Sequence, residues 1–141
     1  MLEELFTGAW QSLVFGLTGI ALMAVGFVVV DMLTPGKLRE LIWEQRSGNA
    51  ATLLAANQLG ISLIVFTAIF TSYDDFGKGL ASTALFGLIG IVLMGLGFVV
   101  LDWLTPGKLG EIIAQTEGHP AARVAAASHF GAALIVCACI A

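Results

Sequence analysis

Two aspartates are the residues of this sequence best placed for chemistry. Asp31 and Asp102 each lie near the end of a long apolar stretch. A carboxylate inside a membrane helix is costly, so it usually faces the interior of a helix bundle and meets a polar partner. A pair of such carboxylates could attract small cations or protons to the mouth of a passage through the membrane.

The candidate partners of the aspartates are polar side chains in two other apolar stretches. Asn57 and Gln58 lie in one of them, and Ser128 and His129 lie at the equivalent places in the other. One interpretation joins all of these residues to the aspartates in a single polar cluster. His129 would make that cluster sensitive to protons, because histidine changes its charge near neutral pH.

A structural interpretation competes with the cluster. In it, each aspartate caps the short helix that follows or pairs with Lys37 or Lys108. The amides then only join helices, as polar side chains often do in membranes. The sequence leaves both interpretations open.

Each aspartate introduces the same motif. The two copies of the motif contain Thr34, Pro35, Gly36 and Lys37, and Thr105, Pro106, Gly107 and Lys108. When residues 13–65 are aligned with residues 84–136, 28 of the 53 positions are identical. Self-similarity of this extent predicts a duplicated structural unit. We therefore expect one membrane domain over residues 1–141, with repeat one at about 10–73 and repeat two at about 80–141.

The composition predicts a membrane protein in contact with the lipid bilayer. Apolar residues make up 58% of the chain and charged residues 11%, whereas soluble domains carry roughly 25% charged residues. The net charge of −4, with no basic patch, argues against nucleic acid as a partner. An acidic start, with Glu3 and Glu4, is unlike the basic start of a signal peptide.

Four apolar stretches are long enough to cross a bilayer. We expect an all-α polytopic membrane protein in which four transmembrane helices, at about 10–33, 50–73, 80–104 and 121–141, form two tandem parallel repeats of a helical hairpin. A polar turn over residues 74–79 would join the repeats. In each motif, the threonine followed by proline predicts the start of a short amphipathic interfacial helix with its apolar side toward the acyl chains. An irregular polar loop is the alternative.

Glycines recur on one side of the first and third long apolar stretches, and one glycine lies on a face of small residues in the second and in the fourth. They are Gly16, Gly19, Gly26 and Gly60, followed 71 residues later by Gly87, Gly90, Gly97 and Gly131. Small residues let helix backbones approach closely in lipid. These faces are therefore expected to contact other helices.

Basic residues predict the orientation of the chain. Five of the six, Lys37, Arg39, Arg46, Lys108 and Arg123, fall on the side of the motifs, and Lys78 falls on the other side. The positive-inside rule then places the motif loops in the cytoplasm and both termini outside. No catalytic set, metal-ligand run or cofactor motif is visible, so we expect neither an enzyme nor a bound metal or cofactor.

The repeated Leu-Thr-Pro-Gly-Lys-Leu after an apolar helix, within a duplicated two-span unit, resembles the bacterial membrane family called domain of unknown function 350. The resemblance covers nearly the whole chain. It implies a small four-span protein of the bacterial plasma (inner) membrane with no established activity or ligand residues. Members are often encoded near polyamine or glutathionylspermidine enzymes, and the resemblance therefore implies a link to polyamines or envelope stress.

Two functions fit these observations. The first is an oligomeric channel or transporter for a small cation, a proton or a polyamine. The alternative is a structural or regulatory subunit that assembles with other membrane proteins. Two hairpins hardly enclose a wide pore, so either function favours a homo-oligomer or a membrane-protein partner.

Overall fold

In the part of the chain that the structure describes, the fold is all-α and consists of four long helices and two short ones. The computed structural model of the chain describes residues 1–72 and 74–141. In chain order the helices are α1 (Leu2–Leu33), α2 (Leu38–Trp43), α3 (Gly48–Thr71), α4 (Phe76–Leu104), α5 (Leu109–Ala114) and α6 (Pro120–Ile140). The four long helices are apolar and long enough to cross a bilayer. The chain is therefore a multi-pass membrane protein.

Two long helices are longer than the sequence predicted. α1 begins at Leu2 instead of near Trp10, because no proline separates them and the acidic first turn favours a helix start. α4 begins at Phe76, so most of the predicted polar turn is helical. Asp75 caps α4: its Oδ1 accepts a hydrogen bond from the Lys78 N–H at 3.1 Å, which lowers the pKa of the Asp75 carboxyl.

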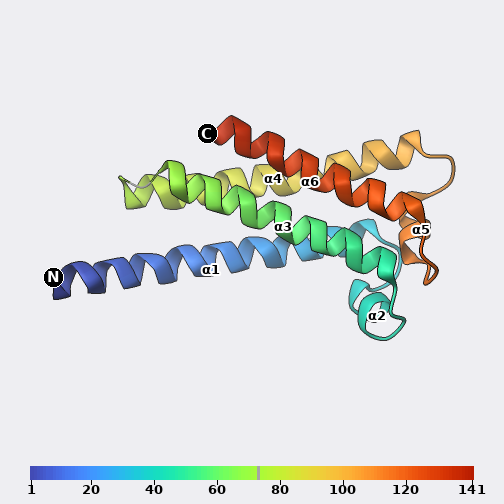
Figure 1. The fold of residues 1–141 in the computed structure, drawn as a ribbon, viewed down its shortest axis with the longest axis horizontal. Helices are drawn as coiled ribbons and strands as arrows, with labels where there is room; N and C mark the ends of the chain where they lie inside the picture. Colours follow the sequence, from blue (N-terminus) through green and yellow to red (C-terminus); the bar gives the residue numbers. More distant parts are fainter. Residues whose placement is uncertain (73) are drawn as a thin grey trace.

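The two halves of the chain have the same order of helices, long then short then long. Figure 1 shows both termini at one end of the bundle, here called the termini end, and α2 and α5 at the other, here called the motif end. α1 and α4 run toward the motif end, and α3 and α6 return from it. The bounds of the two repeats stay predictions, and the predicted helix end at Tyr73 lies outside the described residues.

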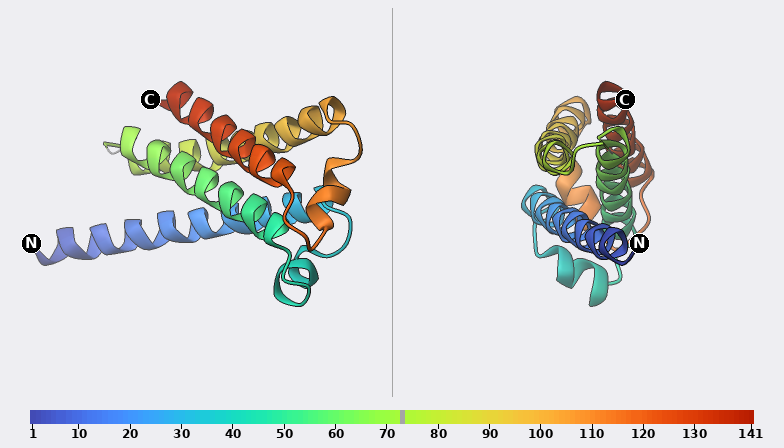
Figure 2. Two further views of the ribbon diagram at one scale, coloured as in Figure 1. Left: turned by 45° about the vertical axis from the view of Figure 1, so that its right-hand side comes forward. Right: turned by 90° about the vertical axis from the view of Figure 1, so that its left-hand side faces the viewer.

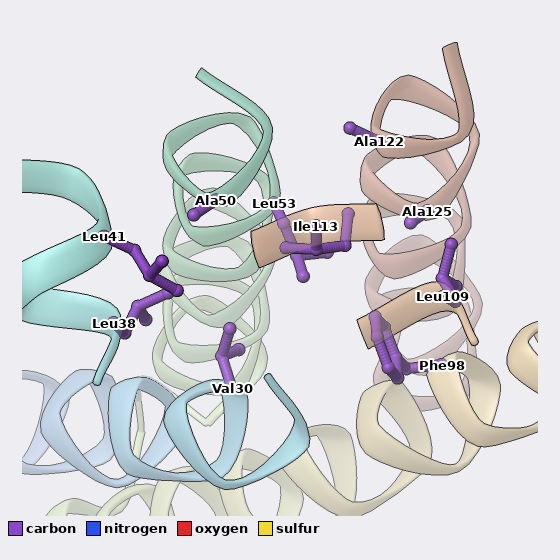
Figure 3. Close-up of a cluster of buried hydrophobic side chains, with 10 residues drawn as sticks. All are labelled: Val30, Leu38, Leu41, Ala50, Leu53, Phe98, Leu109, Ile113, Ala122 and Ala125. Atoms are coloured by element: carbon purple, nitrogen blue, oxygen red, sulfur yellow. The ribbon is translucent and has the colours of Figure 1, made fainter. Parts of the chain in front are cut away.

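α3 lies at the centre of the bundle and packs against α1, α4 and α6, with its most extensive contact to α6. α1 is the most peripheral of the long helices and diverges from the others toward its N-terminus (Figure 2). One core cluster fills the motif end (Figure 3) and contains Val30, Leu38, Leu41, Ala50, Leu53, Phe98, Leu109, Ile113, Ala122 and Ala125. A second cluster lies nearer the termini end and contains Leu22, Ile61, Ile64, Ile91, Met94, Ala133 and Val136.

Glycines permit the closest helix approaches. A Cβ added at Gly60 of α3 would lie 2.8 Å from the Ala133 Cβ of α6, and one at Gly90 of α4 would clash with the Ile64 side chain. The Ile61 side chain fills the space beside Gly26 in the same way, and the Leu22 side chain fills the space beside Gly87. The other predicted packing glycines lie in looser surroundings: Gly19 makes an ordinary contact, and Gly16, Gly97 and Gly131 face open space.

The two short helices form, so the alternative of an irregular loop is wrong, but their apolar sides face the protein. Leu38 and Leu41 of α2 are buried, as are Leu109 and Ile113 of α5. The expectation that these sides face the acyl chains is therefore also wrong. The reason is that the ends of the long helices leave Val30 and neighbouring core residues uncovered, and the short helices complete that core.

Candidate functional site

The two motif aspartates act on the backbone of the short helices. Asp31 Oδ1 accepts a hydrogen bond from the Leu38 N–H at 2.6 Å, and Asp102 Oδ1 accepts one from the Leu109 N–H at 2.5 Å. Each carboxylate thus caps a helix that begins seven residues later. Capping of the following short helix is what the structural interpretation of the aspartates expected.

The motif itself is a turn and does not begin a helix. α2 starts at Leu38, so the prediction that Thr34 is a cap and Pro35 the first helical residue is wrong, and the same holds for Thr105 and Pro106 before α5. Gly36 and Gly107 have φ angles of 92° and 99°. A residue in this left-handed region cannot continue a helix, and glycine adopts it without steric cost.

The motif lysines pair with glutamates and not with the aspartates. Lys37 Nζ lies 3.8 Å from a Glu40 carboxylate oxygen, and Lys108 Nζ lies 3.8 Å from one of Glu111. These pairs are exposed, and pairs of this kind contribute little to stability. Lys108, Glu111 and Asp102 also line a hollow of about 380 Å³ between the end of α1 and α5.

The other predicted cluster residues lie on α3 and α6. Asn57 and His129 are each only 2% exposed. Asn57 approaches α1 at Gly26, whereas His129 lies edge-on to the Phe98 ring of α4, with centroids 6.0 Å apart. Among the described residues, no hydrogen bond or ion pair joins any two of the six predicted cluster residues.

Three of these buried groups have no protein partner. Asn57 Nδ2, Gln58 Oε1 and His129 Nδ1 make no hydrogen bond within the described part of the chain. A buried polar atom without a partner costs roughly 1–3 kcal/mol, so such atoms often mark a bound water or a functional position. Ser128 is half-buried on the same helix as His129.

A polar link between the two halves lies at the motif end, and the sequence did not predict it. Asn49 Nδ2 donates hydrogen bonds to the carbonyl oxygens of Ile112, Gln115 and Glu117 at 3.3, 3.1 and 2.8 Å, and Asn49 Oδ1 accepts one from the His119 N–H at 2.9 Å. This side chain holds the start of α3 against the segment between α5 and α6.

Ser47 strengthens the same link. Its hydroxyl caps α3 by accepting a hydrogen bond from the Ala50 N–H at 3.3 Å, and it lies 2.8 Å from the Gln115 carbonyl oxygen. The equivalent positions in repeat two hold Gly118 and Pro120. A difference between otherwise similar repeats is the signal that could have identified this link from the sequence.

A groove of about 690 Å³ opens between α1 and α3 toward the termini end. Gly16, Gly19 and Met23 form part of its α1 wall, and Ser62 and Val65 form part of its α3 wall. The Ser62 hydroxyl lies 3.8 Å from the Met23 sulfur, and no residue that the structure describes lies within 4 Å of a Cβ added at Gly16. The predicted glycine face of α1 therefore lines an open surface.

Four apolar helices, with two capped motif turns at one end, define a polytopic α-helical membrane protein. The chain matches the family model described as Domain of Unknown Function (DUF350) over residues 4–140, and it belongs to this family.

Two mycobacterial relatives carry the name UPF0719 transmembrane protein. The one from Mycolicibacterium paratuberculosis is 35% identical over 119 residues, which are 84% of this chain and 79% of the relative. The one from Mycobacterium bovis is 30% identical over 120 residues, which are 85% of this chain and 79% of the relative. No solved structure is significantly similar to the chain.

Replacement of Asn49 tests the link between the halves. Asn49→Ala removes the partner of one N–H and of several carbonyl oxygens, and we expect it to lower the free energy of unfolding by about 2 kcal/mol. Asn57→Ala is the matched control, because Asn57 is equally buried but its Nδ2 has no partner. Thermal unfolding in detergent measures both variants. Equal losses of stability would show that the Asn49 hydrogen bonds contribute nothing specific.

Proposed function

We propose that this protein works as a subunit of a membrane assembly and not as an enzyme. The groove between α1 and α3 carries this proposal. Helices in lipid associate through close packing of small residues, and the groove wall includes Gly16, which no described side chain contacts, and Gly19, which only Val65 of α3 approaches. Another membrane helix that covered the groove would complete the packing that the single chain leaves open.

Counting the chains in one particle tests the proposed assembly. The protein is extracted from its native membrane into polymer-bounded lipid discs, and native mass spectrometry gives the mass of each particle. We expect more than one polypeptide per disc, either several copies or this chain with another membrane protein. A single copy alone in every disc would contradict the proposal.

A second candidate function is passage of a small cation or proton through the assembled protein. Asn57 and His129 favour it, because they are buried polar side chains in spanning helices with atoms that lack a partner in the described chain. Polar side chains in such positions often belong to ion or proton pathways. The family resemblance adds polyamines to the candidate cations.

Removing the charge of both motif aspartates tests their part in such a passage. In the double variant Asp31→Asn/Asp102→Asn, the amide oxygens can still accept the Leu38 and Leu109 hydrogen bonds, so helix capping persists. If the carboxylates attract cations, flux into liposomes falls about tenfold or more, as for loss of a charged group at a pore mouth. Asp74→Asn, at the termini end, is the control. Unchanged flux in an intact assembly would remove the aspartates from the pathway.

We also propose that the motif end faces the cytoplasm of a bacterial cell and that both termini lie outside. Five of the six basic residues belong to the motif side of the chain. In a background with Cys137→Ala and Cys139→Ala, a membrane-impermeant maleimide should label Asp74→Cys in intact cells. It should label Glu117→Cys only after permeabilisation. The reverse pattern would invert the topology.

A further inference from the structure

The two repeats pack on each other asymmetrically. Leu22 of α1 lies against Gly87 of α4, where an added Cβ would come within 2.5 Å of the Leu22 side chain. A twofold axis between the repeats would also place Leu93, the counterpart of Leu22, against Gly16, the counterpart of Gly87. Instead Leu93 is 42% exposed and Gly16 faces open space. The contact between the repeats is therefore head to tail.

The contact between α3 and α4 is asymmetric in the same way. Ile64 of α3 fills the space beside Gly90 of α4. Its counterpart Ile135 on α6 is 66% exposed. Gly19, the counterpart of Gly90, has only Val65 of its own repeat nearby, at 3.4 Å from an added Cβ. The counterparts of both residues in this second contact, Ile135 and Gly19, are therefore present on the molecule but do not pack on each other.

The contact at Gly60 gives the third case. Gly60 of α3 lies against Ala133 and Met94 of repeat two. Its counterpart Gly131 has nothing within 4 Å of an added Cβ. The counterparts of Ala133 and Met94 are Ser62 and Met23, and both line the groove.

These counterparts form two complementary surfaces. One is the groove, and the other, here called the projecting face, consists of Leu93, Gly131 and Ile135. Six of the seven repeat-related pairs in these three contacts are identical, against 28 of all 53 aligned pairs. Residues that pack tightly between the repeats therefore recur at positions that the single chain leaves exposed or only partly covered.

We infer that a second copy of this chain places its projecting face in the groove, and so repeats between chains the contact that joins the repeats within one chain. This inference rests on the proposed assembly and names its partner and its surfaces. Both repeats run in the same direction, so the contact keeps every copy in the same orientation in the bilayer (Figure 1). A head-to-tail contact leaves one surface free at each end, so further copies add until a ring closes.

The contact between copies is weaker than the contact within one chain. The hydrogen bonds of Asn49 have no equivalent between copies, because its counterpart is Pro120. Within the chain, Pro35 also packs closely on Gly110 of α5, but the counterpart of Gly110 is Arg39. Copies therefore separate in harsher detergent before the chain unfolds.

Disulfide crosslinking tests the inferred contact. Gly16→Cys and Leu93→Cys are combined in full-length protein that lacks Cys137 and Cys139, and native membranes are oxidised. Gly19 lies beside Val65 of α3 and Gly90 lies beside Ile64, so residues 16 and 93 of one chain are about 9 Å apart along the helices, at 1.5 Å per residue, and are also separated laterally because they belong to two different helices. A disulfide needs Cα atoms within about 7 Å, so any crosslink joins two copies. We expect dimers and higher multimers on a denaturing gel.

The control pair is Leu17→Cys with Leu93→Cys. Leu17 is exposed and directly follows Gly16 in α1, so its side chain points to a different side of the helix. Equal crosslinking of both pairs, or none with either, would overturn the inferred contact. If the particles in lipid discs nevertheless hold several chains, the proposed assembly stands with a different surface. If every particle holds one chain, both proposals fail.

A packing variant gives an independent readout. Gly16→Leu fills part of the groove, and no described residue lies within 4 Å of a Cβ at this position, so we expect the fold to persist. It should weaken self-association about tenfold or more, because a leucine overpacks a surface that fits glycine. Gly97→Leu is the matched control, since Gly97 also faces open space but belongs to neither surface. Unchanged association of Gly16→Leu in a folded protein would overturn the inference.

Discussion

Close approach of helix backbones is the constraint on which this structure depends. Helices in lipid have no water to exclude from between them, so their association rests on packing and hydrogen bonds. α3 reaches α6 where Gly60 faces Ala133, and it reaches α4 where Ile64 fits beside Gly90. A larger residue at Gly60 would push α3 away from α6, whereas one at Gly90 would require the end of the Ile64 side chain to move. The position of α3 in turn determines the shape of the groove beside α1.

The motif end meets a different requirement. Wherever the chain leaves a helix near the bilayer, its backbone N–H and C=O groups still need partners. Asp31 and Asp102 supply acceptors to the short helices, and Asn49 supplies donors to the segment after α5. Asp31 and Asp102 therefore have a structural role at the motif end.

The sequence was sufficient to predict the all-α fold, the four spanning helices and the family, because long apolar stretches and a repeated motif are local signals. The capping of Leu38 by Asp31 was only one of two open interpretations, since periodicity does not determine neighbours. The left-handed Gly36 and the burial of Leu38 were missed, because both depend on how the turn folds back on the bundle. The sequence predicted contacts for all eight glycines. Only the structure distinguishes Gly60, which packs against Ala133, from Gly131, which no described side chain approaches.

Each half of the chain crosses the bilayer twice and returns to the side on which it began (Figure 1). A unit with an even number of crossings can be joined end to end with a copy of itself, and the copy is inserted with the same sidedness. A unit with an odd number of crossings would be inverted by the same fusion. Tandem gene duplication of this hairpin would therefore preserve topology, and each hairpin carries its own basic residues on the motif side.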